Sequence, residues 1–147
     1  MIENMVKKDI MAKVKPKYGR QTIPKPTKTP PKLNKYWGWI QSIVANENLT
    51  IKIIKMKANT QSSMEYHIHK DENYYILSGK IKLGLRIGRA QNKSIILKPG
   101  DVYHIPPGLM HMRIAIEDTE IIEWSNKDDD IDSNIVEDGQ TYIFKES

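Results

Sequence analysis

Short apolar runs separated by turn residues fill the chain from residue 36 onward, and this pattern predicts an all-β fold. Within the runs, β-branched and aromatic residues alternate with polar ones, as in strands that face a core on one side. Gly and Pro break the runs at residues 78–79, 99–100 and 106–108, where they favour turns. The expected strands are residues 49–58, 64–69, 73–77, 80–87, 93–97, 101–105, 111–116, 119–125 and 141–145. Many short strands at this close spacing predict a sandwich or a barrel.

Residues 1–35 have a different texture, which predicts an extended basic N-terminal arm ahead of a barrel at residues 36–147. The arm holds ten Lys and Arg residues against Glu3 and Asp9, together with five prolines. It contains too few large apolar residues to offset the entropy of ordering, so residues 1–20 are expected outside the barrel core. The arm is expected to be solvated or packed on a partner subunit. Nucleic-acid binding is the weaker interpretation, because aromatic residues are nearly absent from the arm.

The composition narrows the remaining classes of protein. A length of 147 residues suits one domain. No apolar run approaches the roughly 18 residues of a membrane span, and the first ten residues lack the apolar core of a signal peptide. We therefore predict a cytoplasmic protein with no membrane partner. The chain has no cysteine, so a metal site would be built from His, carboxylate and water. The acidic run at residues 128–130 is expected to mark a solvated loop.

Three of the four histidines stand where strand geometry could bring them together. His67 and His69 are two residues apart, and residues with this spacing project from the same face of a strand. Glu72 follows a short bend, and His111 follows the Pro-rich turn at residues 106–108. Imidazole and carboxylate suit one divalent ion, Zn, Mn, Fe or Ni, at about 2.0–2.2 Å. These four ligands would leave room on the ion for water or substrate.

Two motifs built on these residues resemble those of the cupin superfamily. The first motif runs through His67-Ile68-His69, Glu72 and Gly79, and the second through Gly100, residues 106–108 and His111. The resemblance implies a cupin barrel, a double-stranded β-helix or jelly roll, with His67, His69, Glu72 and His111 as the metal ligands. Two departures lie in the first motif: only two residues separate His69 from Glu72 where three or four are usual, and Asn59 stands near the expected leading Gly.

Within the superfamily, the chain is most similar to the cupin domain of type II mannose-6-phosphate isomerases. The matching segments are Tyr36-Trp37-Gly38-Trp39, Glu120-Ile121-Ile122-Glu123 and Glu137-Asp138. This resemblance implies a sugar-phosphate isomerase. The arginines that the family carries around the last of these segments are absent here.

The strand alternation also predicts residues of a substrate pocket. Ser63 and Glu65 share the face of His67, Tyr74 shares the face of Glu72, and Arg113 shares the face of His111. We predict Ser63, Tyr74 and Arg113 in the pocket, with Glu65 as the catalytic base and Arg113 as a catalytic residue that binds an anion. Lys82 or Arg86, on the neighbouring strand, would assist Arg113. His104 is expected at the surface or in the core, without a metal.

Three classes of function remain open from the sequence. The favoured one is a homodimeric, metal-dependent isomerase of a small-molecule substrate, a sugar phosphate. The second is a metal-dependent dioxygenase or related oxidoreductase. The third is a non-catalytic cupin that binds or regulates through a sugar. An activity screen on metal-loaded protein would separate them.

Overall fold

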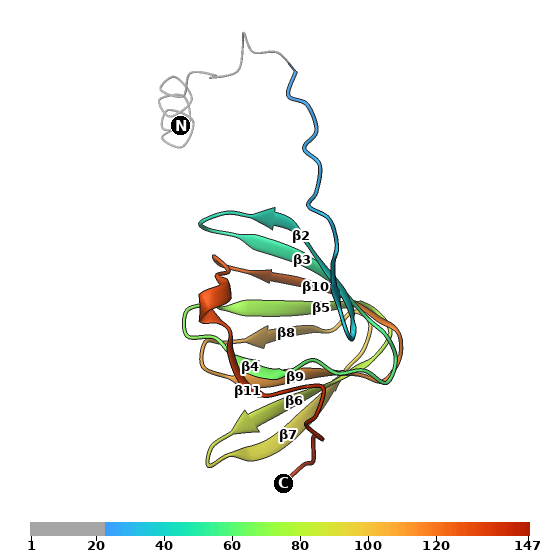
Figure 1. The fold of residues 1–147 in the computed structure, drawn as a ribbon, viewed down its shortest axis with the longest axis vertical. Helices are drawn as coiled ribbons and strands as arrows, with labels where there is room; N and C mark the ends of the chain where they lie inside the picture. The colour runs from blue at the N-terminus through green and yellow to red at the C-terminus, as the bar shows by residue number, and fades with distance from the viewer. Residues whose placement is uncertain (1–22) are drawn as a thin grey trace, which may run out of the picture.

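Two antiparallel sheets face each other in the computed structural model, which describes residues 23–147 (Figure 1). Sheet A contains, in spatial order, β1 (Leu33–Lys35), β2 (Gly38–Ala45), β3 (Thr50–Met56), β10 (Thr119–Ser125), β5 (Glu72–Ser78) and β8 (Val102–Ile105). Sheet B contains β11 (Asn134–Glu137), β4 (Met64–Tyr66), β9 (Met110–Ala115), β6 (Ile81–Ile87) and β7 (Gln91–Leu97). A single 3-10 turn, η1 (Asp130–Asp132), precedes β11. The predicted all-β jelly-roll barrel is confirmed.

The predicted strands between residues 49 and 125 all occur, with shifts at their ends. The largest shift is in β4, which ends at Tyr66 instead of residue 69. Strands β1, β2 and β11 were not predicted. The predicted strand at residues 141–145 does not form, because its carbonyl groups accept hydrogen bonds from side chains: Gln61 Nε2 donates to Tyr142 O, and Asn92 Nδ2 donates to Lys145 O at 3.0 Å.

The core is apolar at one end of sheet A and polar at the other. The register aligns Ile40, Ile54, Ile121 and Ile76 in one inward-facing row across β2, β3, β10 and β5. Burying such side chains stabilises the fold by roughly 1.5–3 kcal/mol each. Two residues further along β10, the inward positions become polar with Glu123 and then Ser125. This polar end is where the candidate site lies.

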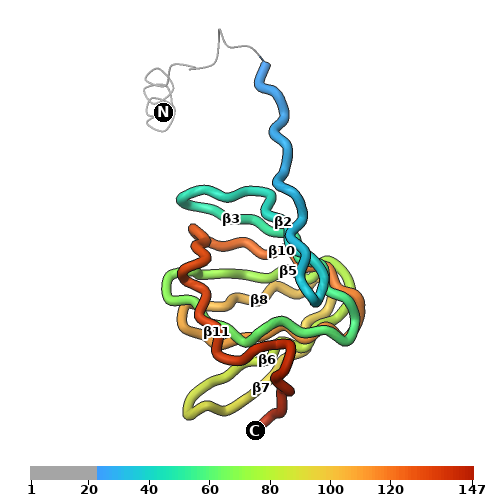
Figure 2. Tube along the Cα trace, viewed as in Figure 1, coloured from blue at the N-terminus to red at the C-terminus, as the bar shows by residue number. Residues whose placement is uncertain are grey.

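The segment after β11 covers the outer face of sheet B (Figure 2). Phe144 packs over Gly84, where an added Cβ atom would lie 2.9 Å from the Phe144 ring. Arg86 forms an ion pair with Glu137 at 3.1 Å and donates a hydrogen bond to the Tyr142 hydroxyl at 3.0 Å. The last residues therefore hold β6 and β7 in place from outside.

The predicted arm is described only from residue 23 onward. Leu33–Lys35 forms β1, which pairs with β2 at the edge of sheet A, and residues 23–32 are exposed (Figure 1). Residues 1–20, which were expected not to belong to the barrel core, lie outside the part of the chain that the structure describes. Across residues 23–147, no helix has the length and apolar character needed to cross a bilayer.

Candidate metal centre

A bend held by one aspartate determines which side chains enter the site. After β4 ends at Tyr66, the chain turns at residues 67–70. The carboxylate of Asp132 accepts hydrogen bonds from the backbone N–H groups of Ile68, His69 and Lys70 at 2.7, 2.9 and 2.8 Å. The bend takes the segment out of strand alternation, so that His67 and Lys70 are buried while His69 is exposed.

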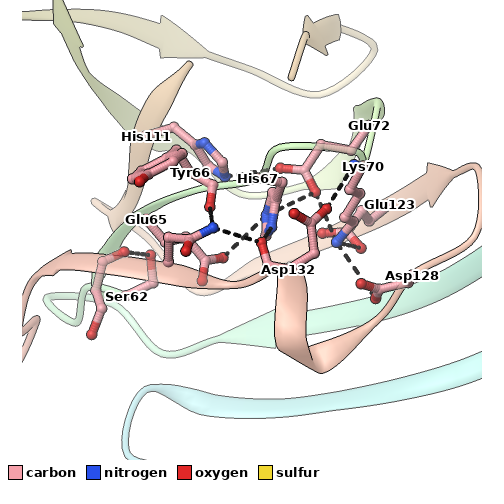
Figure 3. A network of polar contacts seen from close by, with 12 residues as sticks. Ser62, Glu65, Tyr66, His67, Lys70, Glu72, His111, Glu123, Asp128 and Asp132 are labelled. Carbon is pink, nitrogen blue, oxygen red and sulfur yellow. Dashed lines mark hydrogen bonds and ion pairs between the residues drawn. The ribbon is translucent and has the colours of Figure 1, made fainter. Parts of the chain in front are cut away.

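Glu65, His67 and His111 bring one ligand atom each to within 4.8 Å of one another (Figure 3). Glu65 Oε1 lies 3.6 Å from His67 Nε2. Glu72 adjoins the group, with Oε1 2.8 Å from His111 Nε2 and Oε2 3.8 Å from His67 Nε2. Ligands at about 2.0–2.2 Å from a common ion are separated by up to about 4.4 Å. The spacings therefore suit a single divalent ion held by two imidazoles and one or two carboxylates.

Both imidazoles are oriented for metal binding by backbone carbonyl groups. His67 Nδ1 lies 3.0 Å from the carbonyl oxygen of Asp132, and His111 Nδ1 lies 2.8 Å from that of Leu109. A carbonyl oxygen can only accept, so each Nδ1 carries the hydrogen and donates it. In its neutral form, each ring then presents the lone pair of Nε2 to the site. Such partners usually fix the ring orientation of metal-binding histidines.

The site contains buried polar atoms that lack hydrogen-bond partners. They are His67 Nε2, His111 Nε2 and Glu72 Oε2. The short approach of His111 Nε2 to Glu72 and that of Lys70 to Glu72 Oε2 are ion pairs without well-directed hydrogen bonds. Buried polar atoms are rarely left unpartnered, and a bound divalent ion would satisfy these three. The residues present therefore fit a metal ion.

Electrostatics keeps this centre charged. Burial opposes ionisation of Glu72, but the His111 ring and the Lys70 ammonium outweigh it and hold the pKa of Glu72 well below its usual value. Burial would likewise lower the pKa of His111, whereas the nearby carboxylate of Glu72 raises it above the ordinary value. An ion and a proton thus compete for His111 Nε2, because a metal ligand must be deprotonated.

The structure does not bring His69 into this group. Its ring is exposed, and the hydrogen bonds of His69 are made by its backbone to Asp132 and Asn126. The expectation that His67 and His69 share a strand face fails because β4 ends before either residue. If His67 is taken as the second ligand of the first motif, four residues lie between it and Glu72, which is a usual spacing. The first ligand of the motif is then Glu65, two residues before His67.

Asn59 supports this register. Its φ angle is +62°, in the left-handed region that favours glycine, and it stands near the position where the first motif has its leading Gly. Asn tolerates this conformation better than most residues. The departures noted in the sequence therefore result from counting the first motif from His69 instead of from His67.

Lys70 takes a place in the buried site that the sequence did not predict. Its ammonium lies 2.9 Å from Glu72 Oε2, 3.2 Å from Glu123 Oε2 and 3.5 Å from Asp128 Oδ2 (Figure 3). Burial alone would lower the pKa of Lys70, but these carboxylates raise it above the usual value. Asp128 also pairs with Lys52, so the acidic run at residues 128–130 is not simply a solvated loop.

A cavity of about 430 Å³ opens beside the metal group, and Glu65, His67, Lys70, Glu123 and Arg113 line it. Arg113 is buried, and among the described residues it has no carboxylate within ion-pair distance. Its Nη1 donates to the Tyr74 hydroxyl at 2.9 Å, its Cζ atom lies 5.2 Å from the centroid of the Trp37 ring, and its Nε has no hydrogen-bond partner. A buried guanidinium in this state can bind an anionic ligand.

The other predicted pocket residues occupy different places. Ser63 lines the cavity, and its Oγ accepts from Gly139 N at 3.0 Å. Tyr74 is fully buried behind the site, where its hydroxyl donates to Glu72 Oε1 at 3.3 Å. Lys82 and Arg86 lie under Phe144 and Tyr142 on the outer face of sheet B, so they do not assist Arg113. His104 is exposed and pairs with Asp71, which agrees with the surface position expected for it.

Residues 52–124 match the family described as the Cupin domain. This chain contains a cupin domain. The matched residues include every member of the metal group, together with Lys70, Glu123 and Arg113. The segments outside the match, β1, β2, η1 and β11, complete the cupin barrel and line part of its cavity.

Solved structures similar to this cupin barrel share its fold at low sequence identity. An oxalate decarboxylase from Bacillus subtilis has a TM-score of 0.68 at 16% identity, covering 82% of this chain and 35% of its own. The capsular polysaccharide assembling protein CapF from Staphylococcus aureus has a TM-score of 0.66 at 18% identity, covering 76% and 33%. KdgF from Halomonas sp. has a TM-score of 0.54 at 24% identity, covering 63% and 83%.

The chain thus spans about a third of the length of the first and second of these proteins. Among curated proteins, none is significantly similar in sequence. The likenesses establish the fold, and the activity of the cupin barrel has to be argued from its site.

Proposed function

We propose that this cupin is a metal-dependent isomerase acting on a small sugar that carries one anionic group, with a sugar phosphate as the first choice. One observation carries the proposal. The metal group and the guanidinium of Arg113 line or adjoin the same cavity. They come from the paired strands β4 and β9 of sheet B and from the bend after β4. A substrate whose anionic group is bound to Arg113 would have its carbonyl- and hydroxyl-bearing carbon atoms near the metal group.

A divalent ion at this site would act as a Lewis acid on a carbonyl and hydroxyl pair. Glu65, predicted as the base, belongs to the group of ligands, so in the proposal it helps to hold the ion. Glu123 is the better candidate for moving a proton between neighbouring substrate carbons. Its carboxylate lines the cavity, and burial together with the charge of Glu72 raises the pKa of Glu123 above the usual value. A base with a raised pKa works closer to neutral pH.

Arg113 determines the expected charge of the substrate. A buried guanidinium that bonds a charged ligand group contributes about 1.5–3 kcal/mol, and here one guanidinium is available for the task. A single anchor suits one phosphate or one carboxylate. The name of the similar oxalate decarboxylase indicates that a protein with this fold can act on a small carboxylate. A sugar that carries a carboxylate is therefore the second substrate class to be tested.

The ligand set also favours one alternative function, a dioxygenase. Two histidines and one carboxylate with open positions are the usual ligands of non-haem Fe(II) oxygenases. Glu65, His67 and His111 have this composition. Oxygen consumption by the Fe(II)-loaded protein in the presence of a uronic acid would distinguish this alternative from isomerisation.

The deciding experiment assays protein loaded with Zn²⁺, Mn²⁺, Ni²⁺ or Fe²⁺ against mannose 6-phosphate, fructose 6-phosphate and a uronic acid. Arg113→Met should lower kcat/KM by about 10- to 150-fold, the equivalent of one charge-assisted interaction. Arg86→Met is the matched control, because Arg86 is another arginine of sheet B but lies partly buried on its outer face. Binding without turnover by any metal form would leave a non-catalytic sugar-binding cupin.

A cytoplasmic location and a homodimer complete the proposal. The cysteine-free sequence suits a reducing compartment. For the dimer, the support is an outward-facing row of apolar residues, Ile53, Ile122, Tyr75 and Val102, aligned across four strands of sheet A. Val102 is 60% exposed. Light scattering on the purified protein measures the oligomeric state directly.

A further inference from the structure

Lys70 is a buried lysine that joins the candidate metal centre to a second group of carboxylates. It is 4% exposed, and its ammonium contacts Glu72, Glu123 and Asp128 (Figure 3). The three carboxylates come from the start of β5, from the middle of β10 and from the loop that follows β10. One side chain thus connects segments that are far apart in the sequence.

The contact with Glu72 is the shortest of the three. Lys70 Nζ lies 2.9 Å from Oε2, while the other oxygen of the same carboxylate, Oε1, lies 2.8 Å from His111 Nε2. Tyr74 donates a further hydrogen bond to Oε1. The orientation of the Glu72 carboxylate is therefore fixed by different partners on its two oxygens.

We propose that Lys70 is a positioning residue for the metal ion, holding Glu72 so that its carboxylate faces the ligand atoms of His67 and His111. The inference rests on the proposed metal site. Without the ammonium, Glu72, Glu123 and Asp128 would be three carboxylates sharing one buried region, and their mutual repulsion would move Glu72 away from the group. The attraction that holds Glu72 outweighs the repulsion between the ammonium and the ion, because Lys70 contacts the carboxylate directly.

Lys52 provides a matched control for the effect of charge. It is a lysine of the same ion-pair network and contacts Asp128, but it makes no contact with Glu72. Removing either ammonium lowers the local positive charge by one. Only the removal of Lys70 releases a carboxylate of the metal centre.

The experiment measures the dissociation constants of Zn²⁺ and Mn²⁺ by isothermal titration calorimetry for the full chain and for Lys70→Met, Lys70→Arg and Lys52→Met. Partners that orient metal ligands typically change metal affinity by about 10- to 100-fold when they are removed. We expect Lys70→Met to weaken binding by this factor. Lys70→Arg keeps the charge and should restore most of the affinity, and Lys52→Met should stay within about threefold of the wild type.

The outcomes separate this inference from the proposed function. If the wild type binds neither ion, the proposed metal site is wrong. If the wild type binds but Lys70→Met binds equally well or more tightly, the site stands and the positioning role of Lys70 is wrong. Should Lys70→Met fail to fold, Lys70→Gln, which keeps a polar side chain but removes the charge, takes its place: an affinity at least about tenfold below that of Lys52→Met supports the positioning role, and an affinity equal to that of Lys52→Met contradicts it.

Discussion

Glu65 on β4 stands directly opposite His111 on β9 in the ladder of sheet B. Directly opposite residues in an antiparallel pair have Cβ atoms about 4.5–5.5 Å apart and point to the same face. The carboxylate and the imidazole therefore meet because of strand register, with no loop needed to bring them together. His67 joins them two residues after Glu65, at the point where β4 has ended.

The first prediction distinguishes this ligand group from the one expected from the sequence. Glu65→Gln, His67→Ala and His111→Ala should each weaken the binding of a divalent ion by at least about tenfold, because each removes one ligand atom. His69→Ala should leave the affinity nearly unchanged, since its ring is exposed. Calorimetric titration with Zn²⁺ measures all four variants.

A loss of affinity in His69→Ala equal to that in His67→Ala, with Glu65→Gln unaffected, would restore the ligand set His67, His69, Glu72 and His111. Circular dichroism of each variant checks that the barrel remains folded.

The second prediction concerns Asp132, which holds the bend after β4. Asp132→Ala removes the acceptor of three backbone N–H groups, so we expect a loss of about 1 kcal/mol in unfolding free energy, at the low end because water reaches this carboxylate. Metal affinity should fall as well, because the carbonyl group that orients His67 belongs to the same residue. Asp130→Ala is the control in the same turn, and an equal effect in both variants would contradict the role of Asp132.

The third prediction is a pH dependence of stability caused by Asp128. Burial alone would raise its pKa, but Lys70 and Lys52 outweigh burial and hold the pKa of Asp128 below its unfolded value. The ionised carboxylate therefore stabilises the fold above the unfolded pKa of about 3.9, and this contribution is lost as the pH falls through the lower, folded-state pKa. Urea unfolding at about pH 7 and about pH 3 should show a smaller difference in unfolding free energy for Asp128→Asn than for the wild type.

Glu117→Gln is the control for this measurement, because Glu117 is exposed and forms no ion pair in the described part of the chain. If Asp128→Asn keeps the full difference between the two pH values, the ion pairs of Asp128 do not contribute to acid unfolding.

The fourth prediction concerns the contact between Gly84 and Phe144. Gly84→Ala should lower the unfolding free energy by about 1–3 kcal/mol, because the new methyl group would lie 2.9 Å from the ring and 3.0 Å from Met112 Cγ. Phe144→Ala should also destabilise the barrel. In the double variant the clash with the ring is gone and only the contact with Met112 Cγ remains, so the two losses should not add in full. Additive losses in urea unfolding would show that the ring does not press on Gly84.

The strands were predictable because alternation and turn residues agree over residues 49–125. The ligand group was only partly predictable. Spacing led to His67 and His111, which lie in the group, and to Glu72, which adjoins it, while Glu65 was expected as the base. His69 was included because a run of alternating residues continues past the true end of β4. That end depends on Asp132, more than sixty residues further along the chain, and no local pattern marks such a contact.

Lys70 was missed for a related reason. In a continuing strand, Lys70 would point away from His67 and Glu65, toward water, where lysines are usually found. The bend reverses this expectation and buries the side chain among carboxylates from two other segments. The spacing did contain a sign that His69 is not a ligand. The gap between His69 and Glu72 has an unusual two residues, whereas the gap between His67 and Glu72 has the usual four.

The dependence of the ligand bend on Asp132 also sets an order of events during translation. Glu65, His67, Glu72 and His111 are all synthesised before residue 132, yet the bend that turns His67 inward has no acceptor for its N–H groups until Asp132 has left the ribosome. A nascent chain that has reached only β10 holds every proposed ligand and still lacks the arrangement that would bind the ion. Metal loading would therefore come late, after β10 is made.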